Sequence, residues 1–362
     1  MSLEASVVTE VARPWPKVVK YGLPGGFCAG VERSVKAYRD FVANHPNRRI
    51  YSVGEPAHNP YVNEEFIRQG VTFVASIDQV PGDADVAFGP HGHTGKDLEV
   101  LQQSGQVGPE EASMQRRDFI LTECPLVTKV KTEIARNTED GYVTIYYGQL
   151  LKDKDGVVIG PHPETRAAMS AGNVRLVTSL EEALSDDLYE QIDDPTKVAF
   201  ATQTTHNADE ALEMGESLLE IFPQMRLPKT DDICYATRDR QKAAKAVIED
   251  GAEVVVVVGD KDTSSNTRSL AATAAKSGTR VIIVNSRKEL RAEDFYGASS
   301  VGIVASASAP GIQIQGVIGF FEERGSELQI AEVADESNIH FKSPRVQTAY
   351  APEIIWTSPT AS

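Results

Sequence analysis

The sequence of 362 residues contains few cysteines, only three, and few histidines, only seven. Domains held together by disulfides are rich in cysteine and usually have an even number, so a disulfide scaffold is not expected. No two of these cysteines stand two to four residues apart, the spacing of most structural zinc sites. The scarcity of cysteine thus argues against both common structural uses of this residue.

Several other features are missing. The longest apolar run, Val254–Val258, is far shorter than the roughly 18 residues that a membrane helix needs. A net charge of −16 provides no basic surface for nucleic acid or anionic lipid headgroups. The N-terminus, with Glu4 and Glu10, lacks the basic and then apolar pattern of a secretory signal. We therefore expect a cytoplasmic protein that binds neither nucleic acid nor membranes.

What the chain does contain is an alternation of strands and helices. Short β-branched runs predict strands, and runs with a 3.6-residue apolar period predict helices. The predicted strands are Val18–Tyr21, Ile50–Val53, Val86–Phe88, Phe119–Thr122, Val143–Tyr147, Val198–Ala201, Val254–Val258, Val281–Val284 and Val301–Val304. The predicted helices are Val31–Ala43, Pro60–Gln69, Val127–Asn137, Ala208–Phe222, Thr237–Glu249 and Thr267–Ser277. This order indicates an α/β fold with mostly parallel sheets, and the length allows two or three domains.

A longer repeat is superimposed on this alternation. Cys28, Cys124 and Cys234 each stand directly before a predicted helix. Each is followed by two polar loops at strand ends, and these loops carry His58, His162 and Ser264–Asn266, then His91, Thr204 and Ser308. The pattern predicts three pseudo-symmetric βαβ-type lobes, residues 17–123, 124–232 and 233–322, with an extension over 323–362. Because ligands bind at the carboxyl ends of parallel strands, the three thiols and six loops are expected to converge on one central cavity.

Three thiolates from three lobes suit an iron–sulfur centre. Cubane clusters are usually held by four cysteine thiolates, so three would leave one iron open to a substrate. An open Lewis-acidic iron on a redox-active cluster suits removal of a hydroxyl group with delivery of electrons. The alternative is three buried and inert cysteines, since free cysteine is often buried.

The polar loops are typical of an anion site. Ser264, Ser265 and Asn266 begin a helix, where hydroxyl and free backbone N–H groups bind phosphate, and Ser308 precedes another helix start. Three further donors around a diphosphate would be His58, His91 and His162. Each could instead be a helix cap or a structural side chain. Neither a P-loop nor a dinucleotide-binding glycine motif is present, so ATP and NAD are not implied.

An acid follows in the sequence HPE. Enclosure in a cavity would raise the pKa of Glu164 and suit it to proton donation near neutral pH. Thr204, in the run TQTT, could relay that proton or hold a substrate hydroxyl. Glu164 could equally be a favourable charge at a helix N-terminus. The remaining histidines, His45, His93, His206 and His340, are expected to be structural or exposed.

These motifs together resemble a known family. PGGFCAGVERSV, AHN, HG, ECPLVTKV, HPET, ATQTT, DDICYAT, SSNT and ASAP occur in the order of the LytB family of 4-hydroxy-3-methylbut-2-enyl diphosphate reductases, over roughly residues 17 to 322. The resemblance implies the last step of the non-mevalonate isoprenoid pathway. In that step two electrons and two protons remove an allylic hydroxyl as water, giving isopentenyl and dimethylallyl diphosphate. It also implies ferredoxin or flavodoxin as the electron donor.

The resemblance assigns roles residue by residue. Cys28, Cys124 and Cys234 match the ligands of one 4Fe–4S cluster, which can also be isolated as a 3Fe–4S form. Glu164, Thr204 and His162 match the catalytic network around the substrate hydroxyl. The substrate-binding residues are His58, His91, His162, Thr204, Ser264, Ser265, Asn266 and Ser308.

The chain departs from the family pattern in places. Pro90 precedes His91 where alanine is expected, Gly311 follows ASAP where aspartate is common, and the serine loop has one extra residue before SSN. Stretches Gln103–Arg117 and Leu150–Val158 look like polar insertions. Two alternative functions are an iron–sulfur hydro-lyase acting on a related diphosphate without net redox change, and a non-catalytic iron–sulfur redox sensor.

Overall fold

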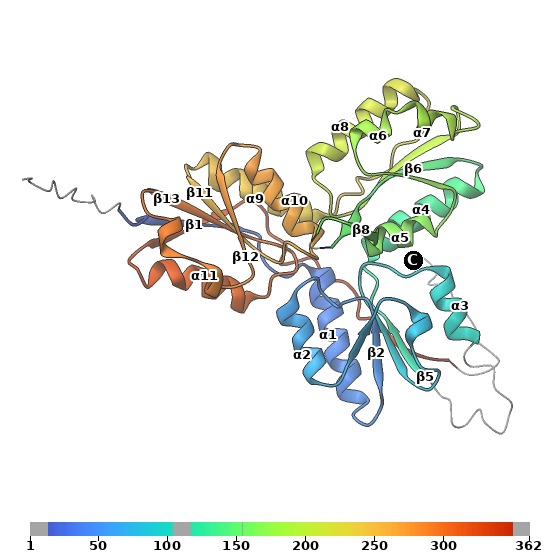
Figure 1. The fold of residues 1–362 in the computed structure, drawn as a ribbon, viewed down its shortest axis with the longest axis horizontal. Helices are drawn as coiled ribbons and strands as arrows, with labels where there is room; N and C mark the ends of the chain where they lie inside the picture. The colour runs from blue at the N-terminus through green and yellow to red at the C-terminus, as the bar shows by residue number, and fades with distance from the viewer. Residues whose placement is uncertain (1–13, 104–116, 154, 350–362) are drawn as a thin grey trace, which may run out of the picture.

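The computed structural model describes residues 14–103, 117–153 and 155–349, which form three α/β lobes around a common centre (Figure 1). Every strand and helix predicted from the sequence overlaps an observed element. The predicted insertion Gln103–Arg117 lies almost entirely outside the described residues. None of the helices in the described ranges has the length and apolar composition needed to span a bilayer.

The first lobe is built on a five-stranded sheet in the order β15-β5-β4-β2-β3. Its strands pair in parallel except for the edge strand β15, which is antiparallel to β5. The elements of this lobe are α1 (Ala29–Asn44), β2 (Ile50–Val53), α2 (Pro60–Arg68), β3 (Thr72–Val74), η1 (Ile77–Gln79), β4 (Asp85–Phe88), α3 (Gly95–Gln103), β5 (Arg117–Leu121) and β15 (Val346–Ala349).

The second lobe has a three-stranded parallel sheet in the order β10-β6-β9. Its elements are α4 (Pro125–Glu139), β6 (Val143–Tyr147), α5 (Pro163–Met169), β9 (Val174–Val177), α6 (Leu180–Ala183), α7 (Asp186–Glu190), β10 (Val198–Thr202) and α8 (Ala208–Ile221). The stretch Leu150–Val158, expected to be a polar insertion, forms most of an antiparallel hairpin of β7 (Leu150–Lys152) and β8 (Val158–Pro161). Val157, Val158 and Ile159 near its tip are exposed.

The third lobe has a five-stranded parallel sheet in the order β12-β11-β13-β1-β14. Its elements are β1 (Val18–Leu23), α9 (Tyr235–Glu249), β11 (Val254–Val258), α10 (Ser265–Ala275), β12 (Arg280–Val284), η2 (Arg287–Glu289), η3 (Ala292–Asp294), β13 (Ser300–Ala305), α11 (Gly311–Glu322) and β14 (Glu327–Glu332).

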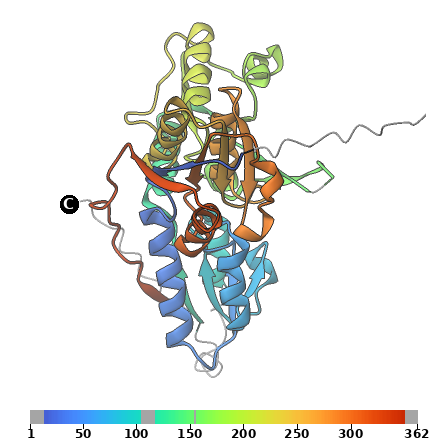
Figure 2. The same cartoon turned by 90° about the vertical axis from the view of Figure 1, so that its left-hand side faces the viewer.

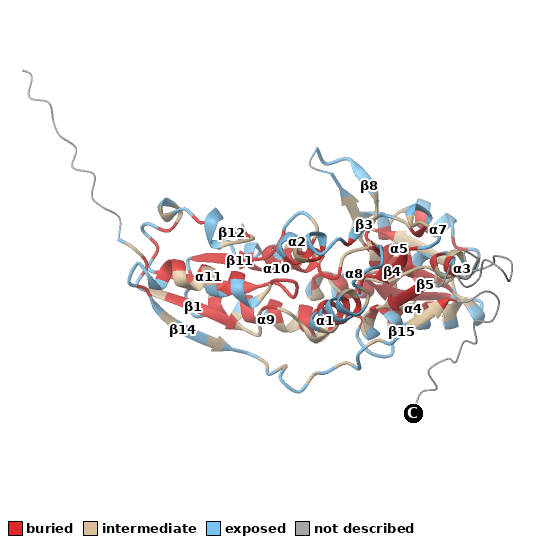
Figure 3. Ribbon diagram, turned by 90° about the horizontal axis from the view of Figure 1, so that it is seen from below, coloured by how far each residue is buried: buried red, intermediate tan, exposed pale blue. Residues whose placement is uncertain are grey.

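The strand β11 shows why the apolar runs of this chain form central strands. All five of its valines are buried, and it lies within the red interior of the lobe (Figure 3). Val254, Val256 and Val258 pack into one apolar cluster, whereas Val255 and Val257 pack into another on the opposite face. A parallel sheet covered by helices on both faces needs such a continuous apolar run, because successive side chains point to opposite faces.

The chain crosses from one lobe to the next at each cysteine. β1 belongs to the third sheet, yet the helix that follows Cys28 packs in the first lobe. Cys124 separates β5 of the first sheet from α4 of the second lobe. Before Cys234 the chain pairs with the second sheet at Arg226, and α9 then packs in the third lobe.

Strand pairing therefore differs from the predicted domains at both ends of the chain. The range 17–123 would place β1 in the first lobe, but β1 lies between β13 and β14 of the third sheet. The range 323–362 was expected to be an extension, but β14 and β15 are edge strands of the third and first sheets. The first predicted range begins at the strand before Cys28, whereas each lobe begins at the helix that follows its cysteine. The exact division into domains stays a prediction.

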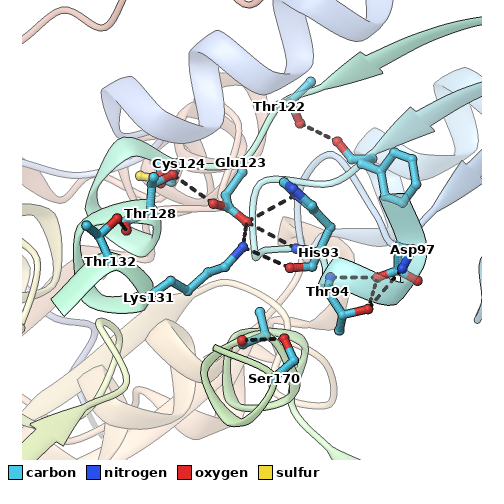
Figure 4. A network of polar contacts seen from close by, with 12 residues as sticks. His93, Thr94, Asp97, Thr122, Glu123, Cys124, Thr128, Lys131, Thr132 and Ser170 are labelled. Carbon is cyan, nitrogen blue, oxygen red and sulfur yellow. Dashed lines mark hydrogen bonds and ion pairs between the residues drawn. The ribbon is translucent and has the colours of Figure 1, made fainter. Parts of the chain in front are cut away.

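A network around Glu123 fastens the loop after β4 to the start of α4 (Figure 4). Its Oε2 atom lies 3.1 Å from Nδ1 of His93 and 2.7 Å from Nζ of Lys131. Its Oε1 atom accepts a hydrogen bond from the Thr128 hydroxyl at 2.7 Å. Burial alone would raise the pKa of this carboxyl, but His93 and Lys131 lower it to about 2. The network fixes the loop that carries His91 against the segment that carries Cys124.

Replacing Glu123 by glutamine removes this charge while keeping the size of the side chain, so Lys131 loses its acid partner. We expect the free energy of unfolding at pH 7 to fall by about 3 kcal/mol, as when a buried ion pair loses one member. The matched control is Glu65→Gln, because Glu65 pairs with Arg39 on the surface and such pairs contribute less than about 1 kcal/mol. Urea unfolding followed by circular dichroism measures both changes.

The difference in the free energy of unfolding between the wild type and Glu123→Gln should depend on pH. The pKa of Glu123 is lowered from 4.5 to about 2 in the folded chain, so its stabilisation is complete above the higher value. It is lost as the pH falls towards the lower value. The difference between wild type and Glu123→Gln should shrink over that interval. A difference that stays constant from neutral to strongly acid pH would contradict the ion pair.

Candidate active site

The three cysteines occupy equivalent places, each as the N-cap of a long helix: α1, α4 and α9. All three are free thiols, and all three line one cavity between the lobes. A Cβ atom added at Gly30 would lie 3.1 Å from Sγ of Cys124 and 3.7 Å from Sγ of Cys28. The absence of a side chain at Gly30 therefore leaves space between thiols of two different lobes.

The environment of the thiols favours their neutral form. Burial, with the neighbouring Cys28 as a further cause, raises the pKa of Cys124 and of Cys234 to about 12. Thiolates here would need a positive charge beside them, which bound metal supplies. Within the described residues, no group of three His, Cys, Asp or Glu side chains is arranged to hold a single metal ion. Three thiols that line one cavity are a donor set that fits a metal centre held by thiolates.

Three histidines gather in another part of the same cavity. His58 and His91 stack with their ring centroids 3.8 Å apart, and His162 meets them edge-on at 5.3 and 5.9 Å. His162 is also the N-cap of α5, because its Nδ1 accepts a hydrogen bond from the backbone N–H of Glu164 at 3.2 Å. In the neutral ring the proton then lies on Nε2.

These rings present unused hydrogen-bonding atoms. The Nε2 atoms of His58 and His162 are buried and have no hydrogen-bond partner among the described residues. Burial, followed by the neighbouring His58, lowers the pKa of His91 and of His162 well below the usual range. Buried polar atoms are almost always paired in native proteins. The unpaired nitrogens are therefore suited to a polar ligand in the cavity.

Hydroxyl and amide groups from the third lobe also line the cavity. Together with the three histidines they form what we call the polar wall: His58, His91, His162, Ser264, Ser265, Asn266 and Ser308. Ser264 caps α10 by accepting from the N–H of Thr267 at 3.2 Å, and it accepts from the Ser308 hydroxyl at 3.3 Å. Ser265 accepts from Thr205 at 2.9 Å. Ser264 is therefore a helix cap, which was one of the two roles expected for it. It also lines the cavity.

Asn266 is held by two hydrogen bonds that lead back to a cysteine. Its Oδ1 accepts from the N–H of Ala307 at 2.8 Å, and its Nδ2 donates to the Thr237 hydroxyl at 2.9 Å. That hydroxyl oxygen lies 3.1 Å from Sγ of Cys234, and the Thr237 N–H donates to the same sulfur at 3.3 Å. The polar wall and the thiol of the third lobe are therefore one connected unit.

Glu164 and Thr204 are both buried in the lining of the cavity. Thr204 donates its backbone N–H to Oε2 at 2.9 Å, and its hydroxyl lies 3.0 and 3.1 Å from the two carboxyl oxygens. Burial raises the pKa of Glu164 to about 7, although both Thr204 hydrogen bonds act to lower it. Near neutral pH the carboxyl can thus exist in both forms, as a proton donor must.

All of the residues predicted as ligands or catalytic groups line this one cavity. The cavity is also lined by four residues that were not predicted from the sequence: Thr205, Tyr235, Thr237 and Phe341. Thr237 could have been found, because it stands three residues after Cys234 in the first turn of a helix. Phe341 could not, since it comes from the C-terminal extension. The four other histidines do not line the cavity: His93 joins Glu123, His206 stacks on Tyr147, His45 pairs with Asp118, and His340 is exposed.

Residues 19–322 match the model of a family described as LytB protein. Proteins of Escherichia coli and Escherichia fergusonii named 4-hydroxy-3-methylbut-2-enyl diphosphate reductase are 34% identical over 328 residues, covering 89% of this chain and 95% of theirs.

Two solved structures have a similar fold. A structure titled as the E-1-hydroxy-2-methyl-but-2-enyl-4-diphosphate reductase from Plasmodium falciparum superposes with a TM-score of 0.76 at 21% identity, covering 91% of this chain and 96% of that one. A second structure, titled as the terminal enzyme of the non-mevalonate pathway, gives 0.55 at 25% identity, covering 84% and 99%. The family match spans all three lobes, and the chain belongs to the LytB family.

Proposed function

We propose that this chain is a 4-hydroxy-3-methylbut-2-enyl diphosphate reductase, which removes the allylic hydroxyl with two electrons and two protons. The products are isopentenyl diphosphate, dimethylallyl diphosphate and water. The observation that carries the proposal is the convergence of three thiols, an anion-binding wall and one acid with a pKa near neutrality on a single cavity. The family membership and the names of the relatives support it.

Cys28, Cys124 and Cys234 would hold the iron–sulfur cluster. Their common place at the N-termini of three helices gives each sulfur a helix dipole that favours the thiolate. When bound, a 4Fe–4S cluster with only three protein ligands supplies electrons and one open Lewis-acidic iron. Thr237 directs its N–H to Cys234, and hydrogen bonds to cluster sulfurs are one of the means by which proteins tune the reduction potential.

The polar wall would bind the diphosphate without a formal positive charge. No lysine or arginine is among the described residues that line the cavity. Seven residues therefore provide neutral donors: His58, His91, His162, Ser264, Ser265, Asn266 and Ser308. A bound diphosphate would favour the protonated rings of His91 and His162 and so oppose the lowering of their pKa by burial. Binding should thus strengthen as the histidines take up protons.

Glu164 would donate a proton toward the substrate hydroxyl, with Thr204 holding its carboxyl in place. Because its pKa is about 7, a substantial fraction of Glu164 is protonated near neutral pH. The carboxylate that remains after proton transfer is an effective base. His162, whose Nδ1 accepts the Glu164 backbone N–H, orients the start of the same short helix.

Two expectations from the sequence remain predictions of this proposal. The electron donor is expected to be ferredoxin or flavodoxin, small proteins that pass single electrons. The enzyme is expected in the cytoplasm, where such donors and the isoprenoid precursors would meet it.

The direct test of the reaction follows a reduced viologen dye under anaerobic conditions, with protein whose cluster has been reconstituted. Addition of 4-hydroxy-3-methylbut-2-enyl diphosphate should oxidise two dye molecules per isoprenyl diphosphate formed. Loss of water from the substrate without dye oxidation would instead identify a hydro-lyase. A stable cluster with neither product nor oxidation would leave the redox-sensor function.

Glu164→Gln isolates proton delivery from binding. The amide can still accept the Thr204 N–H, so the cluster and the affinity for the diphosphate should persist, while kcat falls by about 10²- to 10⁴-fold. The matched control is Asp232→Asn. Burial also raises the pKa of Asp232, to about 6, but this carboxyl pairs with Lys129 and does not line the cavity. An undiminished kcat in Glu164→Gln would rule out the proton-donor role.

The pH profile gives the sign of this effect. The proton-donating form of Glu164 predominates below a pH of about 7, so the kcat of the wild type should decline above that pH. In Glu164→Gln the remaining rate should no longer show this decline, whereas Asp232→Asn should keep it. Stopped-flow measurement from pH 6 to 9 would decide between these outcomes.

A further inference from the structure

The segment that follows β14 connects the third lobe to the first. β14 pairs with β1 of the third sheet, and β15 pairs with β5 of the first. Residues 333–345 lie between them, and we call them the C-terminal strap. Figure 2 shows this red segment passing beside α1 on its way to β15. Neither the lobe repeat nor the chemistry of the cavity gives the strap a role.

One end of the strap is anchored by an ion pair with Arg240 of α9. Nη1 and Nη2 of Arg240 lie 2.8 and 3.2 Å from the two carboxyl oxygens of Glu336. The side chain of Arg240 is 1% exposed and that of Glu336 is 14% exposed, so the pair is almost completely buried. Breaking such a pair leaves an uncompensated charge in the interior, which is strongly unfavourable.

The same guanidinium connects two of the cysteine segments. Nη2 of Arg240 donates to the carbonyl of Gly26 at 2.8 Å, two residues before Cys28. Nη1 donates to the carbonyl of Ala236 at 2.9 Å, two residues after Cys234. Glu336 therefore holds the strap against a side chain that joins these two segments across the lobes.

The other end of the strap reaches the third cysteine segment. The carbonyl of Lys342 accepts from Nε of Arg33 at 2.6 Å. Nη1 of Arg33 donates in turn to the carbonyls of Thr122 and Glu123, directly before Cys124, at 2.9 and 3.1 Å. Between these two anchors, Phe341 lines the cavity that contains the thiols.

We propose that the C-terminal strap is a wall of the active site, in which the Glu336–Arg240 pair is the anchor and Phe341 is the cover over the cysteines. The strap holds the three cysteine segments at fixed positions and limits the access of solvent, oxygen and small oxidants to the sulfurs. Phe341 and Glu336 are thus positioning residues. The proposal rests on the proposed function only in taking the three thiols as cluster ligands.

The test measures access to the sulfurs rather than turnover. In the metal-free full-length chain, the alkylation rates of Cys28, Cys124 and Cys234 by iodoacetamide are followed by peptide mass spectrometry under native conditions. In the reconstituted protein, bleaching of the cluster absorbance in air is followed in parallel. Phe341→Ala changes no charge or hydrogen bond, and Glu336→Gln breaks the anchor.

We expect both variants to raise the alkylation and bleaching rates by about tenfold or more, while Phe341→Leu stays close to wild type. The matched control is Glu323→Gln, which breaks a bidentate ion pair of the same chemistry with Arg287 on the surface. Rates that are unchanged in Phe341→Ala would overturn the proposal. So would an equal increase in Glu323→Gln, because the effect would then reflect general loosening.

The result of the alkylation test does not depend on whether the protein is a reductase. Faster alkylation in Phe341→Ala would support the strap even in a protein that does not oxidise the dye. Normal turnover with no change in alkylation would overturn the strap while leaving the reductase. If Glu336→Gln does not fold, Phe341→Ala still decides the question.

Discussion

The structure depends on one constraint: three thiols from three lobes must meet at one point. Each thiol stands at the N-terminus of a helix, where the helix dipole favours a thiolate, and each is partly buried, which disfavours one. Mutual repulsion adds to the cost, as the raised pKa values of Cys124 and Cys234 show. A metal centre resolves this conflict. We therefore infer that the cavity is organised around a cluster.

The topology meets the constraint by changing lobes at every cysteine. β1 of the third sheet leads to Cys28 and the first lobe, β5 of the first sheet leads to Cys124 and the second, and the chain beside the second sheet leads to Cys234 and the third. Each thiol therefore lies on a crossover between lobes. β1 lies near the start of the chain, and it pairs with β13 and β14, which lie near the end. The third sheet therefore brings the chain back to its first strand.

Much of this arrangement could be predicted because its signals are local. The valine run of β11 must be a buried strand, and a cysteine before an amphipathic helix must lie at that helix's N-terminus. Because this unit occurs three times along the chain, the sequence then predicts that the three cysteines converge on one cavity. The assignment of β1 could not be predicted, since its sequence fits any parallel sheet and only pairing with β13 selects the third one.

The C-terminal extension was beyond prediction for a related reason. β14 is an edge strand with mostly exposed or half-buried residues, and β15 is four residues long, so neither has a strong periodic pattern. The pair of Arg240 with Glu336 spans 96 residues and has no sequence signal. Phe341, which lines the cavity, lies between two such distant contacts, those of Glu336 and Lys342.

The central claim is that the three cysteines hold one cluster with one iron left for the substrate. Mössbauer spectroscopy of protein reconstituted with isotopically enriched iron tests it, with and without 4-hydroxy-3-methylbut-2-enyl diphosphate. The account predicts a 4Fe–4S spectrum in which one iron site alone changes on adding the diphosphate, and loss of that spectrum when Cys28, Cys124 or Cys234 is replaced by serine. A spectrum that does not respond to the diphosphate, or that survives all three replacements, would contradict it.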